Sequence, residues 1–175
     1  MKKNIFIVLF LFQAIFTCGQ TLNIVTHNTK PKLEWSDFKS EIMSIDTLKG
    51  FNFNCTIQMR TLKVNVWTGV TTFEAYGIYY PTTSWVLKSK KSDKLLTYFQ
   101  LQFDISNAIG KQLEKEINVK KINGAYKNKM ENVFKEYETR LNNILQKMDM
   151  ETENGKNNSE IEKWDSKLKN GTINN

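Results

Sequence analysis

Histidine is nearly absent from this sequence, and its scarcity excludes more chemistry than any other feature. The 175 residues contain a single histidine, His27, shortly after the N-terminal apolar run. A zinc site built from histidine needs more than one such ligand, and a Ser-His-Asp or Cys-His system would have to use His27 itself. We therefore expect neither kind of site and interpret His27 as a solvated loop residue.

Cysteine and glycine are also scarce. The two cysteines are Cys18, at the end of the N-terminal apolar segment, and Cys55. Once that segment is removed, Cys55 stands alone and no internal disulfide can form. We expect Cys55 to be a small buried hydrophobic residue rather than a reactive thiol. The eight glycines are scattered, so the sequence offers no glycine-rich loop for a phosphate.

Long apolar runs are absent except at the N-terminus. Two lysines precede an apolar run over residues 5–12 that continues weakly to residue 16. This pattern is typical of a secretory signal peptide, here residues 1–19, and the run is short for a membrane span. Two alternatives stay open: an uncleaved anchor helix, and a lipoprotein acylated at Cys18, where Phe16 and Thr17 replace the smaller residues that such a signal prefers. We predict an exported protein, periplasmic or extracellular, with no transmembrane span in the mature chain.

The charge balance is basic but not concentrated. Lysine and arginine number 25 against 18 acidic residues, a formal net charge of +7. The lysines form only short clusters beside turn signals, at 88–91 and 120–121. Nucleic-acid binding needs a denser basic face, so no nucleic-acid partner is expected. Attraction to an acidic envelope surface fits the excess charge better.

Periodicity divides the rest of the chain into strands followed by helices. Residues 51–67 alternate apolar and polar, which predicts two half-buried antiparallel strands. Residues 71–80, before Pro81, predict a third strand, and residues 83–87 predict a short one.

Past residue 94 the apolar spacing becomes helical. It predicts one long helix capped by Asp93 and a second over residues 126–148. Ser159 and Glu162 form the pattern of a capping box for a short helix ending near residue 168. Residues 169–175 are expected to be a frayed tail. The order predicts one α+β domain, residues 20–168: an N-terminal antiparallel sheet, two long helices and a short C-terminal helix.

Four motifs and a later tryptophan resemble a known family. They are Leu-Glu-Trp-Ser-Asp-Phe at 33–38, Ser-Trp-Val at 84–86, Leu-Leu-Thr-Tyr-Phe-Gln-Leu-Gln-Phe-Asp-Ile at 95–105 and Asp-Met-Glu-Thr-Glu-Asn-Gly at 149–155, with Trp164 beyond. In order and spacing they resemble the bacterial family called domain of unknown function 922, regarded as predicted secreted zinc-dependent proteases. The resemblance implies a zincin-like fold. The retained motif positions are Trp35, Asp37, Phe38, Ser84, Trp85, Phe103, Asp104, Asp149, Glu151, Thr152 and Gly155.

The departures from the family pattern fall on its metal and base positions. Tyr98 stands where the family has the first histidine of its His-Glu-x-x-His motif, Phe99 where it has the glutamate, and Gln102 where it has the second histidine. Asn154 stands at the downstream histidine. None of these four is a usual zinc ligand or a general base near neutral pH. The resemblance therefore implies a degenerate member without catalytic residues, metal or cofactor. We expect Phe99 to fill the vacated site and Tyr98 to pack with its hydroxyl toward water or a partner.

Three functions follow as alternatives. The first is a non-catalytic, zinc-free binding or scaffold module whose cleft binds an extended peptide or envelope protein along a sheet edge. The second is a peptidase that builds a metal site from other residues, such as Asp104 and Glu151 with His27. Asp104, Asp149 and Glu151 would form a carboxylate pair if two helices met there, although exposed helix carboxylates are more often solvated. The third is a structural envelope protein with a closed cleft.

Overall fold

A long β-hairpin and a long helix set the frame of the molecule. The structure, a computed structural model, describes residues 23–40, 49–120 and 127–173. In it β3 (Cys55–Val64) and β4 (Thr71–Tyr79) pair antiparallel, and α1 (Asp93–Val119) packs along both. The short strand β1 (Val25–Thr26) joins the other edge of β4, so the sheet has the order β1-β4-β3.

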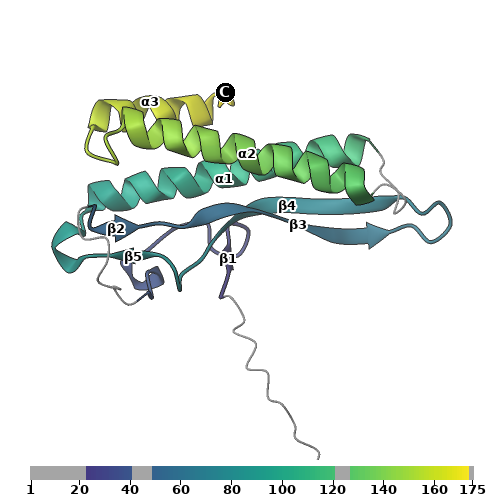
Figure 1. Cartoon of the computed structure of the whole chain (residues 1–175), viewed down its shortest axis with the longest axis horizontal. Helices are drawn as coiled ribbons and strands as arrows, with labels where there is room; N and C mark the ends of the chain where they lie inside the picture. The colour runs from purple at the N-terminus through teal and green to yellow at the C-terminus, as the bar shows by residue number, and fades with distance from the viewer. Residues whose placement is uncertain (1–22, 41–48, 121–126, 174–175) are drawn as a thin grey trace, which may run out of the picture.

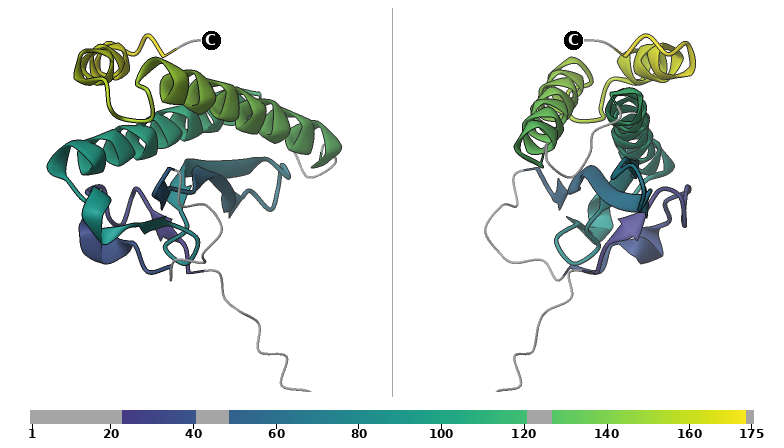
Figure 2. Two further views of the ribbon diagram at one scale, coloured as in Figure 1. Left: turned by 60° about the vertical axis from the view of Figure 1, so that its left-hand side comes forward. Right: turned by 90° about the vertical axis from the view of Figure 1, so that its right-hand side faces the viewer.

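The remaining elements lie on the two sides of α1. A second sheet pairs β2 (Phe51–Asn52) with β5 (Trp85–Val86). The helices α2 (Lys127–Glu151) and α3 (Asn158–Lys169) lie on the side of α1 away from the sheets, so α1 is the middle layer (Figures 1 and 2). Short 3-10 turns occur at η1 (Trp35–Asp37) and η2 (Lys88–Lys90). The predicted α+β class, with strands first and helices after, is confirmed.

The core follows the predicted helical stripes. On α1 the side chains of Ile105, Ile109, Leu113 and Ile117 are fully buried, and on α2 those of Leu141, Ile144 and Met148 are 0–2 % exposed. As the middle layer, α1 must be apolar on more than one face, which explains why Tyr98, Phe99, Leu101 and Phe103 are all buried in its first turns.

Side chains of α1 accept hydrogen bonds from backbone N–H groups of β4 that β1 does not pair. Asn118 Oδ1 accepts from Phe73 N at 2.9 Å, Glu114 Oε2 accepts from Ala75 N at 3.0 Å, and Asn107 Oδ1 accepts from Gly77 N at 3.3 Å. These acceptors stand four and seven residues apart, on one face of the helix. The edge of β4 is therefore closed to any further strand.

The strand prediction was partly wrong over residues 51–67. These residues do not form two strands that pair with each other: 51–52 pair with β5, and 55–64 form one strand that pairs with β4 across a bulge between Thr61 and Lys63. The alternation placed the apolar residues at and after the bulge inside the protein. They are exposed instead: the exposed fraction is 61 % for Leu62 and 52 % for Val64. The strands predicted at 71–80 and 83–87 are confirmed as β4 and β5.

Helix boundaries and the C-terminus also required correction. Ser92, not Asp93, caps α1, since its side chain accepts from Leu95 N at 3.3 Å. Asn157, not Ser159, caps α3. The segment after α3 is not frayed as far as residue 173, because Ile173 is 2 % exposed and its carbonyl accepts from Arg140. Residues 174–175 and the predicted signal peptide lie outside the described residues. Within the described ranges no helix combines the length and apolarity needed to cross a membrane.

Candidate functional site

Phe99, aligned with the catalytic glutamate of the family pattern, lies in a cage of aromatic rings. It is fully buried, and its ring centroid lies 5.1 Å from that of Phe53, 5.2 Å from that of Phe51 and 5.5 Å from that of Phe38. Burying a side chain of this size stabilises the fold by about 1.5–3 kcal/mol. A carboxylate here would lose its hydration. Phe99 is therefore apolar volume in the core, while its place at a vacated metal site stays a prediction.

Tyr98 and Gln102, aligned with the two histidines, form a closed hydrogen-bond network with Asp149. The Tyr98 hydroxyl donates to Asp149 Oδ1, and Gln102 Nε2 donates to the same oxygen at 2.7 Å and to the Tyr98 hydroxyl at 3.0 Å. Burial, and then the neighbouring Asp149 charge, raise the pKa of Tyr98, so its hydroxyl stays a donor. Lys49 Nζ lies 3.5 Å from Asp149 Oδ2. The hydroxyl of Tyr98 is thus directed at an internal carboxylate.

The turn after α2 closes over the same place. Gly155 has φ +82°, and a Cβ at this position would lie 2.8 Å from Cγ of the Tyr98 ring. Thr152 is fully buried and its hydroxyl accepts from Gly155 N at 3.2 Å. Asn154 lies outside the network, on the wall of a cavity of about 260 Å³ that Lys49, Lys94 and Lys156 also line. Of the motif positions, Tyr98, Gln102, Asp149 and Gly155 are therefore neighbours.

His27 is not the solvated residue that we expected from the sequence. Its Nε2 lies 2.8 Å from Asp104 Oδ1, its ring lies 4.9 Å from that of Phe103, and its side chain is 20 % exposed. Gln100 Nε2 donates to the same Asp104 oxygen at 2.8 Å, and Gln100 Oε1 accepts from Leu33 N at 2.8 Å. This group fastens the N-terminal segment to α1.

The three carboxylates considered for catalysis occupy separate places. Asp104 bonds His27, Asp149 bonds Tyr98, and Glu151 accepts from Trp164 Nε1 at 2.9 Å. The helices do not bring them together as a pair. Among the described residues, no three His, Cys, Asp or Glu side chains are grouped so as to hold a metal ion.

The other retained motif positions have structural roles. Asp37 Oδ2 accepts a hydrogen bond from Glu34 N at 2.7 Å and Asp37 Oδ1 forms an ion pair with Lys30 Nζ at 2.5 Å, so Asp37 caps a turn. The rings of Trp35 and Phe38 pack against each other, with their centroids 5.4 Å apart. Ser84 is fully buried and accepts from Asn54 N at 3.1 Å. Trp85 lies in β5, and Phe103 lies in the core, as does Trp164.

Cys55, which belongs to no motif, is buried as expected. Desolvation raises the pKa of its thiol to about 12.

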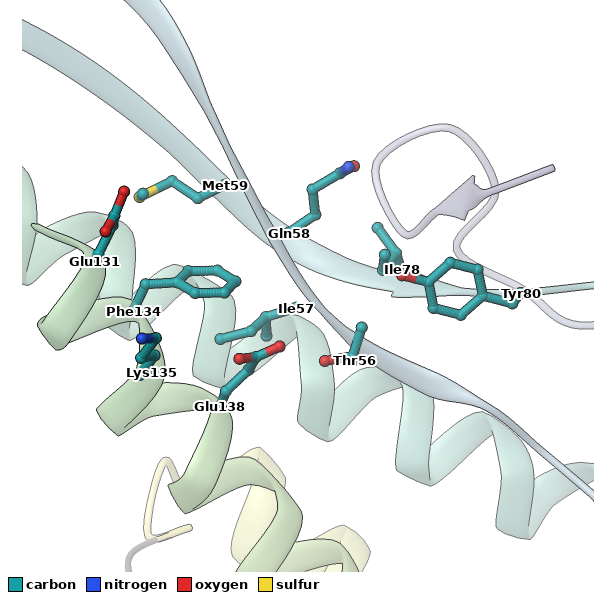
Figure 3. Close-up of a pocket in the computed structure, with 10 residues that line it drawn as sticks. All are labelled: Thr56, Ile57, Gln58, Met59, Ile78, Tyr80, Glu131, Phe134, Lys135 and Glu138. Atoms are coloured by element: carbon teal, nitrogen blue, oxygen red, sulfur yellow. The ribbon is translucent and has the colours of Figure 1, made fainter. Parts of the chain in front are cut away.

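A second open cavity lies elsewhere, between β3 and α2. Its volume is about 480 Å³, and Figure 3 shows Phe134 of α2 directed toward Ile57 of β3, with charged side chains beside it. The walls are formed by Thr56, Ile57, Gln58, Met59, Ile78, Tyr80, Glu131, Phe134, Lys135 and Glu138. We call this cavity the β3 groove. The sequence indicated Phe134 only as part of an apolar helical stripe, and nothing in its spacing distinguished a half-buried groove residue from a core residue.

The backbone of β3 presents unused hydrogen-bonding groups to this groove. On β4 the N–H groups of residues 73, 75 and 77 point to α1, so residues 74, 76 and 78 bond β3 at its partners 60, 58 and 56. Ile57 and Met59 of β3 must then direct their N–H and C=O groups away from β4. No hydrogen bond between described residues occupies these groups. The groove thus combines an open strand edge with an apolar floor.

Comparison of the chain with family models, curated proteins and solved structures gives no match. The resemblance to the domain of unknown function 922 family therefore stays a prediction that rests on the motifs alone.

Proposed function

We propose that this chain is an exported, zinc-free, protease-like envelope protein that binds an extended peptide in the β3 groove. The single observation that carries the proposal is the open edge at Ile57 and Met59, facing a cavity of about 480 Å³. An extended peptide adds to such an edge through main-chain hydrogen bonds, and side-chain pockets provide selectivity. Phe134 offers apolar contact, while Glu131, Lys135 and Glu138 supply charges around it.

We propose that the protein is protease-like in fold but has lost the metal-binding and catalytic residues of the family motif. Phe99 is buried in aromatic rings, and the Tyr98–Gln102–Asp149 network occupies the positions of the two motif histidines. In the proposal, core packing has replaced the metal site of a zincin-like ancestor. The peptidase alternative requires metal binding, and the zinc titration described in the Discussion separates it from the binding module.

Substitution of one edge residue tests the groove. We expect Met59→Pro to weaken binding of a peptide selected from a library of short linear peptides by about tenfold, because proline removes the outward N–H. The β3–β4 ladder does not use that N–H, and proline is tolerated at a strand edge, so the fold should persist. Binding is measured by fluorescence anisotropy with the labelled peptide.

Met59→Val is the matched control, since it shortens the same side chain but keeps the N–H. Equal binding by the two variants would contradict addition of the peptide to the β3 edge. Failure of the wild-type chain to select any peptide would overturn the proposed function itself and favour the structural alternative.

A further inference from the structure

The tip of the β3–β4 hairpin exposes two large apolar side chains. Trp67 is 97 % exposed and Val66 is 91 % exposed, while Leu62 and Val64 on the same arm are 61 % and 52 % exposed. The hairpin runs past the ends of α1 and α2 and projects from one end of the molecule (Figure 1). Exposed large apolar groups gathered at one place mark an interaction site more often than isolated ones do.

The turn that carries these side chains is internally bonded. Asn65 N donates to Val70 O and Gly69 N donates to Asn65 O, both at 2.8 Å. Asn65 Oδ1 accepts from the N–H groups of Trp67 and Thr68, each at 3.0 Å, and Gly69 adopts φ +66°. The tip therefore presents Val66 and Trp67 on a defined turn, with most of its polar backbone already satisfied.

The charges near the tip are basic or neutral. No acidic residue occurs between residues 61 and 73, and Arg60, at the base of this segment, is neutralised by Glu74 at 2.7 Å. Lys63 is exposed and forms no ion pair with a described residue. The chain as a whole carries a formal charge of +7. An anionic surface is the complementary partner.

We propose that the hairpin tip, residues 62–70, inserts into the interfacial region of an anionic lipid bilayer. Tryptophan prefers the headgroup level of membranes. A lipid environment favours backbone polar groups that are satisfied internally, and Asn65 satisfies the N–H groups of Trp67, Thr68 and Gly69. Lys63 then faces the lipid phosphates. This attachment is independent of the β3 groove, which lies between β3 and α2.

Insertion is tested with the full chain and vesicles of phosphatidylcholine with or without phosphatidylglycerol, using brominated lipids as fluorescence quenchers. We expect quenching of Trp67 on anionic vesicles, weaker quenching on neutral ones, and loss of that quenching in Trp67→Phe. The double variant Val66→Ser, Trp67→Ser should lower vesicle affinity by about tenfold or more, because it removes the apolar area that is buried on insertion.

Met150→Ser is the matched control, since Met150 is 67 % exposed near the end of α2, and it should bind vesicles as the wild type does. Because the tip side chains are exposed, all variants should keep the wild-type melting temperature. Absence of Trp67 quenching would overturn the proposal, as would unchanged vesicle affinity in the double variant. Self-association of the wild type that the double variant abolishes, without quenching by lipid, would instead assign the tip to contact between copies.

Discussion

Tyr98 and Tyr79 are both fully buried in the same core, but only the Tyr98 hydroxyl makes a hydrogen bond of normal geometry. Tyr98 bonds Asp149 and Gln102. The Tyr79 hydroxyl is buried and makes no hydrogen bond of normal geometry with a described residue, although the Asp37 carboxylate is near enough to help raise its pKa. Burial raises the pKa of each above its ordinary value, so both stay protonated at neutral pH. A buried hydroxyl contributes to stability only when it is bonded, and the two residues should therefore respond differently to loss of the hydroxyl.

We expect Tyr98→Phe to lower the free energy of unfolding by about 1–3 kcal/mol, because the half-buried carboxylate of Asp149 loses a charged hydrogen bond from the core. Tyr79→Phe removes the same atom from the same core and should leave stability unchanged or raise it. Urea denaturation of both variants measures the difference. Equal losses in the two variants would show that the Tyr98 network adds nothing beyond packing.

The environment of a single residue can be predicted from the sequence where the residue type itself limits that environment. Phe99 and Cys55 are buried as expected because an aromatic ring and a thiol gain from leaving water. The expectation for His27 was wrong because Asp104, its partner, lies 77 residues away in the chain. No local pattern reports such a pair.

Between elements, α1 and β4 approach more closely than side chains normally allow. A Cβ at Gly110 of α1 would lie 2.9 Å from the backbone of Tyr76, and a Cβ at Gly77 of β4 would lie 2.6 Å from Asn107 N. The neighbouring atoms are backbone atoms, which cannot rotate away. Two glycines thus permit the contact that lets Asn107, Glu114 and Asn118 bond to β4.

We expect Gly110→Ala to lower the free energy of unfolding by about 1–3 kcal/mol, because the methyl group overpacks the contact with β4. In an isolated helix the same change would stabilise by about 1 kcal/mol, so the sign itself is informative. Lys115→Ala on the exposed face of α1 is the control and should leave stability nearly unchanged. Thermal denaturation measures both, and a stabilised Gly110→Ala protein would contradict the close approach.

For the whole molecule, metal binding decides between the binding module and the peptidase. The protein is first treated with a chelator and then freed of it. We expect zinc added afterwards to leave the melting temperature unchanged. A tight native-state site would add about 2.7 kcal/mol at a hundredfold excess of zinc over its dissociation constant. Differential scanning fluorimetry with bound-zinc analysis makes the measurement, and magnesium serves as the control for unspecific ion effects.

One tightly bound zinc per chain would contradict the zinc-free proposal. The residues to substitute would then be His27 and Asp104, which lie 2.8 Å apart, and Glu151, which contacts Trp164 instead. Loss of zinc binding in those variants would assign the zinc to these residues and favour the peptidase alternative, without affecting the membrane proposal for the hairpin tip.

The α+β class, the two long helices, the strand predicted at 71–80 and the lack of histidine ligands all follow from the residues alone. Each follows from a period or a residue type, and these are local properties. Other features depend on contacts between residues that are distant in the chain. Residues 55–64 pair with β4, α1 closes one edge of that sheet while β3 stays open, and Leu62, Val64 and Trp67 are exposed. A period of two tells which side chains share a face of a strand. It does not tell which strand lies alongside, or that the hairpin extends beyond the helix that would cover that face.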